Sequence, residues 1–122
     1  MLAQSQFAIV DDDSSFRVAL LSLVRSLGHA ATGFDSAEAF LASGLADRVD
    51  CIISDIQMPG ITGIELKRQL VASGITTPVV LITGRTEDRF RPEAEAIGAA
   101  CFMRKPFDSQ ELIDCVGRVL GE

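Results

Sequence analysis

The chain has 122 residues, a length that suits one globular domain, since such domains cluster near roughly 100–150 residues. Apolar residues make up 48% of it and charged residues 23%, which is enough for a buried core and unlike a disordered chain. The formal net charge of −6 works against attraction to nucleic acid or to an anionic membrane. We therefore expect one domain over residues 1–122, with no direct nucleic-acid binding and no membrane association.

The cysteines bear on the cellular compartment. Cys51, Cys101 and Cys115 are odd in number and lack paired short spacing, so the pattern predicts neither a disulfide framework nor a zinc site. The apolar stretches are far shorter than the roughly 20 residues of a membrane span, and the first residues lack the features of a secretory signal. A reducing cytoplasm is the expected location.

Short apolar runs alternate with segments of helical periodicity along the chain. The runs that predict strands cover residues 7–10, 30–33, 51–54, 78–82 and 100–103. Helices are predicted over residues 14–27, around 40–41, around 66–71, before 98 and around 112–120. Strand–helix units with such apolar strands are typical of a parallel sheet covered by helices on both faces. The predicted fold class is α/β, with a doubly wound five-stranded parallel sheet.

Capping residues and one proline refine the helix boundaries. Asp35, Thr62 and Asp108 are each followed three positions later by glutamate, a pattern that marks helix starts. Pro92 falls inside the segment expected to be the helix before Gly98, where proline would remove a hydrogen bond and clash unless the helix begins near it. We therefore expect an extended loop from about residue 84 to residue 91, followed by a short or late helix.

Polar residues follow most of the predicted strands. Asp11–Asp13 follow the first strand, Asp55 the third, Thr83 the fourth and Lys105 the fifth. In open parallel sheets, sites form outside the carboxyl ends of the strands, where the strand order reverses. These side chains are therefore expected to meet at one edge of the sheet.

Each of these residues also has a structural interpretation when taken alone. Asp11–Asp13 could load the N-terminus of a helix, where the dipole favours anions, and Asp55 could be a turn residue. Thr83 could be a cap or turn hydroxyl, and Lys105 a solvated charge. Their joint arrival at one edge is what favours a functional site.

Several carboxylates at one edge repel each other, and protonation or a cation relieves that repulsion. Mg²⁺ prefers octahedral oxygen ligation by one or two carboxylates, waters and phosphate oxygens. Beside such an ion, the Thr83 hydroxyl and the Lys105 ammonium could donate to phosphoryl oxygens. The Asp55 carboxylate is then a candidate nucleophile that forms an aspartyl phosphate.

The motifs occur in a fixed order along the chain. They are Val10-Asp11-Asp12, Asp55 with Met58-Pro59-Gly60 and Gly63 after it, Ile82-Thr83-Gly84, and Lys105-Pro106-Phe107. The ordered set resembles the receiver domain of two-component response regulators, over essentially the whole chain. Residues 36–41 make it most similar to receivers that precede helix-turn-helix DNA-binding domains of the nitrogen-fixation regulator type. The resemblance implies a flavodoxin-like (βα)5 sheet with strand order 2-1-3-4-5.

The resemblance also implies a role for each matching acidic residue. Asp55 matches the phosphoacceptor, and Asp11 and Asp12 match the acidic pair that helps to hold Mg²⁺, with Asp12 the more direct ligand. Gln57, two residues after the phosphoacceptor, would contribute its backbone carbonyl to the metal.

Other matching residues would contact the phosphate or change conformation in response to it. Thr83 matches the switch hydroxyl and Lys105 the phosphate-contacting lysine, with a cis Lys105–Pro106 bond. Phe102 stands where the family has its switch aromatic, although an ordinary core position is the alternative. Gln57 and Arg85 occupy positions that in this family modulate the lifetime of the aspartyl phosphate, and a solvated Arg85 is the alternative.

The function implied by the resemblance is signalling. A sensor histidine kinase or phosphotransfer protein would supply the phosphoryl group, Mg²⁺ would be the cofactor, and the protein would catalyse only its own phosphotransfer and slow autodephosphorylation. Thr83 and Phe102 would then change a face that serves a phosphorylation-dependent homodimer or an effector domain.

Two other interpretations compete with this one. Residues 9–15 also resemble the nucleophile motif of haloacid-dehalogenase-like phosphatases, with Asp11 as nucleophile and Asp13 as acid/base, although that family usually has a longer chain and further acidic ligands. The other alternative is a receiver-shaped binding module that works without phosphate. The identity of the phosphorylated aspartate distinguishes them.

Overall fold

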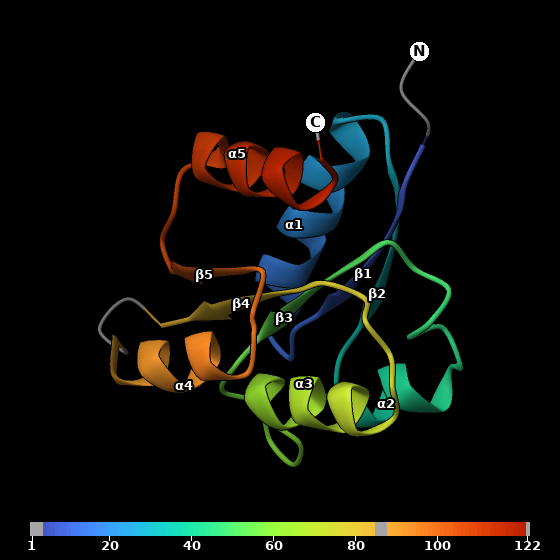
Figure 1. Ribbon diagram of the computed structural model, residues 1–122. Coiled ribbons are helices and arrows are strands. Elements are labelled where there is room, and N and C mark those ends of the chain that lie inside the picture. Colours follow the sequence, from blue (N-terminus) through green and yellow to red (C-terminus); the bar gives the residue numbers. More distant parts are fainter. Residues whose placement is uncertain (1–3, 85–87, 122) are drawn as a thin grey trace.

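The computed structural model describes residues 4–84 and 88–121 (Figure 1). Its five strands are β1 (Gln6–Val10), β2 (Ala30–Phe34), β3 (Cys51–Asp55), β4 (Val79–Thr83) and β5 (Cys101–Arg104). The helices are α1 (Ser14–Ser26), α2 (Ala37–Ala42), α3 (Gly63–Ala72), α4 (Arg91–Ala96) and α5 (Ser109–Val119), with a 3₁₀ turn over Asp88–Phe90. All strand pairs are parallel and the order is β2-β1-β3-β4-β5. The flavodoxin-like fold class and strand order predicted from the sequence are confirmed.

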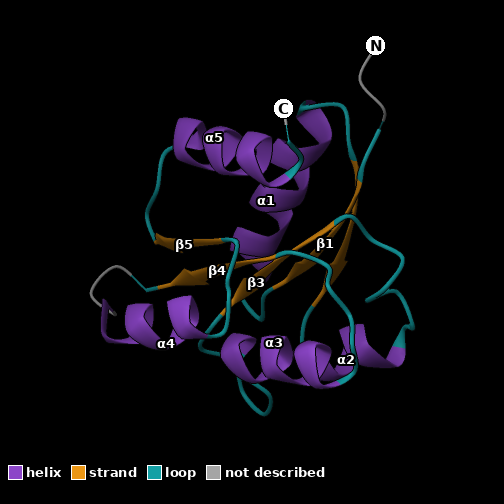
Figure 2. Cartoon of the chain, in the orientation of Figure 1, coloured by secondary structure: helices purple, strands orange, loops and turns teal. Residues whose placement is uncertain are grey.

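The helices form a layer on each face of the sheet. Helices α1 and α5 lie on one face, and α2, α3 and α4 lie on the other (Figure 2). Every residue of β3 and of β4 is buried, because both faces of a central parallel strand are covered. This explains why these segments are almost continuously apolar in the sequence.

Each face of the sheet has its own hydrophobic cluster, because successive side chains of a strand point to opposite faces. Ile52 packs with the α2, α3 and α4 layer, and its neighbour Ile53 packs with the α1 and α5 layer. Phe40 is a fully buried member of the first cluster, and Leu112 is a fully buried member of the second. The sheet therefore separates two apolar layers.

The helix starts follow the predicted capping chemistry with one correction. The side chains of Thr62 and Asp108 each accept a hydrogen bond from the backbone N–H of the residue three positions later, as expected. Helix α2 begins one residue later than the sequence pattern indicates, so that Ser36 and not Asp35 is its N-cap. Both residues are good caps, and the backbone of Ser36 has the extended conformation that capping needs.

The region around Pro92 contains a short, late helix, as predicted. Helix α4 has six residues and begins at Arg91, with Pro92 in its first turn, where a missing N–H removes no intrahelical bond. The expected extended loop is partly wrong, since residues 88–90 form a 3₁₀ turn. Arg85 lies outside the described residues.

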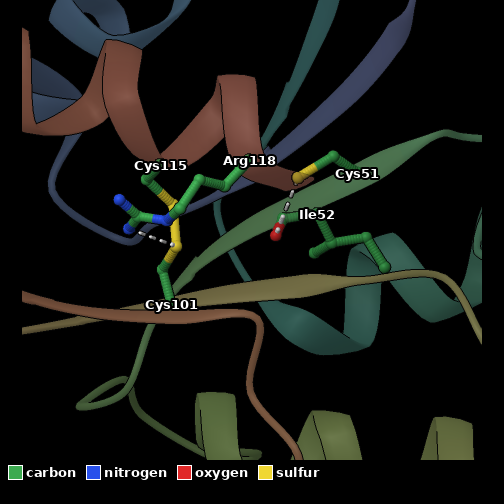
Figure 3. The surroundings of a disulfide bond; sticks show 5 residues. All are labelled: Cys51, Ile52, Cys101, Cys115 and Arg118. Carbon is green, nitrogen blue, oxygen red and sulfur yellow. Dashed lines mark hydrogen bonds between the residues drawn. A yellow bond between two sulfur atoms is a disulfide. The ribbon is translucent and has the colours of Figure 1, made fainter. Parts of the chain in front are cut away.

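One expectation about the cysteines is wrong. Cys101 of β5 and Cys115 of α5 form a disulfide, with their Cα atoms 6.4 Å apart (Figure 3). Their sequence separation of 14 gives no local signal, because the packing of α5 across β5 is what brings the two side chains together. Cys51 is buried and has a free thiol, and burial raises its pKa to about 12.

None of the helices within the described ranges combines the length and the apolar character needed to cross a membrane.

Candidate functional site

Three carboxylates gather at the edge where the strands end. Asp11 directly follows β1, Asp12 comes next, and Asp55 is the last residue of β3. One ligand oxygen from each lies within 4.8 Å of the others. Asp11 and Asp55 are buried and Asp12 is exposed. The adjacent pairing of β1 and β3 therefore produces the acidic cluster that the sequence predicts.

Lys105 brings a cation to this cluster from the end of β5. Its Nζ lies 3.2 Å from Oδ2 of Asp11 and 3.4 Å from Oδ2 of Asp55. The same ammonium lies 4.0 Å from the ring centroid of Phe16, at the start of α1. The Lys105–Pro106 peptide bond is cis, as the resemblance implies. Lys105 thus contacts two buried carboxylates and an aromatic ring together.

The environment of Asp55 disfavours its negative charge. The pKa of Asp55 is raised to about 6. Burial is the largest cause, the neighbouring carboxylates of Asp11 and Asp12 act in the same direction, and the Lys105 ammonium opposes them. The positive charge of the lysine only partly compensates for desolvation and repulsion. A cation at this position would favour the ionised form.

The carboxylates of Asp11 and Asp13 have different hydrogen-bond partners. The backbone N–H of Asp13 donates to Oδ1 of Asp11 at 2.9 Å, and Nη1 of Arg17 donates to the Asp11 carbonyl at 2.6 Å. The Asp13 carboxylate instead accepts from the backbone N–H groups of Ser15 and Phe16 at the start of α1. The helix-capping interpretation is therefore correct for Asp13, whereas Asp11 and Asp12 belong to the cluster.

Thr83 ends β4 at the same edge of the sheet. Its side chain is fully buried, and its hydroxyl oxygen has no hydrogen-bond partner among the described residues. The Thr83 carbonyl accepts from the backbone N–H of Lys105 at 2.8 Å, which ties the end of β4 to the residue after β5. A buried hydroxyl without a partner is energetically unfavourable. The Thr83 hydroxyl is therefore able to form a hydrogen bond with a group bound at the edge of the sheet where the carboxylates lie.

Phe102 lies apart from the carboxylates, on the layer of α4. It is half-buried against the α2, α3 and α4 cluster, and the Arg91 guanidinium lies 4.6 Å from its ring centroid. An open cavity of about 280 Å³ adjoins it, lined also by Arg91, Lys105, Pro106 and Glu111. The aromatic ring therefore has open space beside it on the β5 surface.

The loop after Asp55 contains a contact that the sequence did not indicate. Glu38 of α2 accepts a hydrogen bond from the backbone N–H of Ile61 at 3.1 Å. This contact ties Ile61 to α2. Gln57, two residues after Asp55, is exposed. The glutamate was predicted to serve its own helix start, and its position in a capping pattern hid its longer-range role.

Phe16 and Arg17 were also missed as contributors to the site. Both lie in the helical segment after Asp13, where Phe16 fits the apolar stripe of a core residue. Their contacts with Lys105 and with the Asp11 carbonyl depend on how α1 follows the turn after β1. Their only sequence signal is their closeness to the acidic motif.

The donor set fits a small hard cation. Mg²⁺ binds oxygen at about 2.0–2.1 Å in octahedral geometry, so any two of its ligand atoms lie within about 4.2 Å. The three carboxylate oxygens lie within 4.8 Å of one another, so small side-chain rotations suffice to bring them to one ion. Burial above all, and the neighbouring carboxylates with it, disfavour the ionised form of Asp55 and raise its pKa, and a bound cation would offset both effects.

The structure thus brings together Asp11, Asp12, Asp55 and Lys105, and it places Thr83 at the same edge. Phe102 is outside this cluster, on the α4 layer.

The chain is similar to known proteins over most of its length. Residues 7–117 match the model of the response regulator receiver domain. The chain is 41% identical over 113 residues to the transcriptional regulatory protein FixJ of Azorhizobium caulinodans, which covers 93% of this chain and 54% of that protein. It is 36% identical to nodulation protein W of Bradyrhizobium diazoefficiens, over 88% of this chain and 48% of that protein. The chain spans about half the length of these curated relatives.

Solved structures show the same architecture. The crystal structure of FixJ-N superposes with a TM-score of 0.89 at 32% identity, covering 99% of this chain and 97% of that one. A receiver protein from Burkholderia phymatum has a TM-score of 0.86 at 40% identity, covering 97% and 96% of the two chains. From the matched motifs, the acidic edge and these similarities, we conclude that the chain belongs to the response regulator receiver domain family of two-component systems.

Proposed function

We propose that the chain, as one phosphoacceptor domain over residues 1–122, accepts a phosphoryl group on Asp55 from the phosphohistidine of a sensor histidine kinase or phosphotransfer protein in the cytoplasm. The observation that carries the proposal is the placement of Lys105 between Asp11 and Asp55, with Asp12 completing a compact acidic cluster. The match of residues 7–117 to the response regulator receiver domain supports the proposal.

The reaction would break one bond and form one bond. An Asp55 carboxylate oxygen attacks phosphorus as the phosphorus–nitrogen bond of the phosphohistidine breaks, and the histidine nitrogen keeps the electron pair. Lys105, already 3.4 Å from Asp55, would follow the negative charge to a phosphoryl oxygen. The Thr83 hydroxyl, which has no partner among the described residues, would donate to a second oxygen.

Asp11, Asp12, Asp55 and the backbone carbonyl of Gln57 would hold the ion. When bound, Mg²⁺ would neutralise the charge that builds up on the phosphoryl oxygens in the transition state. Asp11 is fixed for this role by hydrogen bonds to its side chain and its carbonyl. Gln57 and Arg85 would modulate the access of water to the aspartyl phosphate and therefore its lifetime.

The output would be a change of surface. Movement of Thr83 toward the phosphate would vacate space on β4, and Phe102 on the neighbouring strand would turn inward from its half-buried position. The altered face of α4, β5 and α5 would then bind a second copy of the chain or an effector domain.

The direct test is labelling with a small phosphodonor. The protein is incubated with Mg²⁺ and acetyl phosphate, and its intact mass is measured before and after treatment with hydroxylamine. We expect one phosphoryl group per chain, released by hydroxylamine, with the modified peptide containing Asp55. Chelation of the metal should abolish the labelling.

Two variants sharpen the result. Asp55→Asn should remain unlabelled, whereas Asp13→Asn should be labelled like the wild type, because the Asp13 carboxylate caps α1. Label on Asp11, with loss of labelling in Asp13→Asn, would support the phosphatase interpretation. Failure of the folded, Mg²⁺-loaded protein to take up phosphate would support a phosphate-independent binding module.

A further inference from the structure

A second chemical site lies on β5, away from the carboxylates. The disulfide joins Cys101, the first residue of β5, to Cys115 of α5. Cys101 pairs with Val80, near the start of β4, whereas Thr83 at the end of β4 pairs with Arg104. The sulfur pair is therefore displaced along the strand from the acidic edge, and the phosphoryl transfer proposed above makes no use of it.

The two sulfur-bearing residues differ in exposure. Cys115 is 1% exposed, whereas Cys101 is half-buried. An open cavity of about 260 Å³ borders both, and its other lining residues include Met103, Glu111, Asp114 and Arg118. A small thiol or disulfide can therefore approach the pair from solvent, and it meets Cys101 first.

A guanidinium group accompanies the more accessible sulfur. Nη2 of Arg118, one helical turn after Cys115 on α5, donates a hydrogen bond to Sγ of Cys101 at 3.7 Å (Figure 3). A donor of this kind stabilises negative charge on sulfur, and the thiolate is the form that attacks disulfides. Accessibility and charge thus both distinguish Cys101 as the attacking residue and Cys115 as the resolving residue.

We propose that Cys101 and Cys115 form a reversible dithiol–disulfide site that exchanges with small disulfides and dithiols, with Arg118 assisting at Cys101. In oxidation, the Cys101 thiolate attacks one sulfur of a small disulfide, whose S–S bond breaks to release one thiolate. The Cys115 thiolate then attacks Sγ of Cys101 in the mixed disulfide and releases the second thiolate. The protein loses two electrons and two protons, and the reagent gains both as two thiols. A dithiol reductant reverses the sequence.

Cys51 provides an internal comparison. It is a fully buried thiol on β3, and it does not line the cavity. Its Sγ contacts the Ile52 carbonyl, whereas the Arg118 guanidinium donates to Sγ of Cys101 (Figure 3). Chemistry that reaches Cys101 in the folded protein should therefore leave Cys51 unchanged.

The test counts thiols in the intact chain. Reduced protein is incubated with oxidised glutathione, and the reaction is quenched in acid. The protein is then alkylated under denaturing conditions, and its intact mass is measured. We expect the reduced protein to carry an alkyl group on each cysteine and the oxidised protein to carry one on Cys51 alone. Peptide mapping should identify the Cys101–Cys115 link, and dithiothreitol should restore both thiols. No phosphodonor is present, so the outcome is independent of phosphorylation.

Single substitutions test the order of events. Cys115→Ser should accumulate a glutathione adduct on Cys101, whereas Cys101→Ser should leave Cys115 unmodified in the folded protein. Arg118→Gln should slow modification of Cys101 by roughly threefold, because it removes the positive charge beside the sulfur. The matched control Arg48→Gln, at an exposed site after α2, removes an equal charge and should have no effect.

The proposal is overturned if oxidised glutathione leaves every thiol free in the wild type. A stable adduct on Cys101 that never transfers to Cys115 would equally overturn it, as would oxidation of Cys51 at the same rate as Cys101.

Discussion

Asp55 is the residue on which the proposed chemistry depends. Its carboxylate is buried with that of Asp11, and Lys105 contacts both. Burial and the neighbouring carboxylates raise its pKa to about 6 despite the nearby ammonium. Ionisation of Asp55 therefore destabilises the folded protein, and a cation bound beside the carboxylates would offset this effect.

Replacement of Asp55 by asparagine should therefore stabilise the metal-free protein near neutral pH. The pKa of Asp55 rises from 3.8 in the unfolded chain to about 6 in the folded state. The stability that the bound proton contributes is complete below pH ~4 and is lost as the pH rises through about 6. Since each pKa unit corresponds to about 1.4 kcal/mol, Asp55→Asn should gain up to about 3 kcal/mol over the wild type above this range.

Urea unfolding followed by circular dichroism measures this difference, since the chain has no Trp or Tyr for fluorescence. The gain should shrink toward zero near pH ~4, and saturating Mg²⁺ should stabilise the wild type but not the variant. Asp47→Asn, at an exposed position, is the control and should show no such pH step. A variant less stable than the wild type near neutral pH would contradict the electrostatic account.

The sequence was sufficient to predict which polar residues gather where the strands end. Asp11, Asp12, Asp55 and Lys105 were predictable because each follows a strand, and parallel strands end at a common edge. The contact between Phe16 and the Lys105 ammonium was not predictable, because it depends on the direction in which α1 leaves the turn after β1.

At the scale of elements, the junction of β3 and α3 is tightly built. The backbone N–H of Gly63, the first residue of α3, donates to the carbonyl of Ile56 at 2.9 Å. A Cβ on Gly63 would collide with the carbonyl oxygen of Asp55 and lie 3.1 Å from Cα of Ile56. The absence of a side chain at this position is what allows α3 to start so close to the end of the strand that carries Asp55.

We expect Gly63→Ala to destabilise the protein by about 1–3 kcal/mol, because the backbone must shift to admit the methyl group. The matched control is Gly117→Ala in α5, where a Cβ would meet nothing within 4 Å. That change should stabilise the protein by about 0.5–1 kcal/mol, through the higher helix propensity of alanine. Thermal unfolding of the two variants measures both effects. If Gly63→Ala left the stability unchanged, the junction would be shown to accommodate a methyl group.

The elements themselves were largely predictable, and their boundaries less so. Apolar periodicity identified all five strands and the helices between them, and Pro92 located the start of α4. The displaced cap of α2 reflects two adjacent capping residues, Asp35 and Ser36, between which the sequence pattern does not decide. The Cys101–Cys115 bond was not predictable, because it depends on how α5 packs across β5.

In the molecule as a whole, the sheet contributes side chains to two separate apolar clusters, one on each face. Phe40 anchors the cluster under α2, α3 and α4, and Leu112 anchors the cluster under α1 and α5. Both side chains are fully buried. Because β3 and β4 contribute side chains to both clusters, neither layer can lose its packing without exposing strands that the other layer needs.

We therefore expect a truncation in either layer to lower the stability of the entire chain. Phe40→Ala should cost about 3–5 kcal/mol and Leu112→Ala about 2–5 kcal/mol, with a single cooperative transition in each case. Hydrogen exchange should show protection falling together in α3 and α5. Loss of protection in α3 alone after Phe40→Ala, with α5 unchanged, would contradict a shared core.

The alternation of side chains along β5 has a consequence for sequence change in this region. Cys101 packs with the α1 and α5 layer and Phe102 with the α4 layer, although a single peptide bond separates them. Insertion of one residue between Cys101 and Phe102 would place both side chains on the same face of the sheet, so that either the Cys101 sulfur would face α4 or the aromatic ring would face α5. Insertion of two residues would restore both orientations. Viable length changes within this strand should therefore come in even steps.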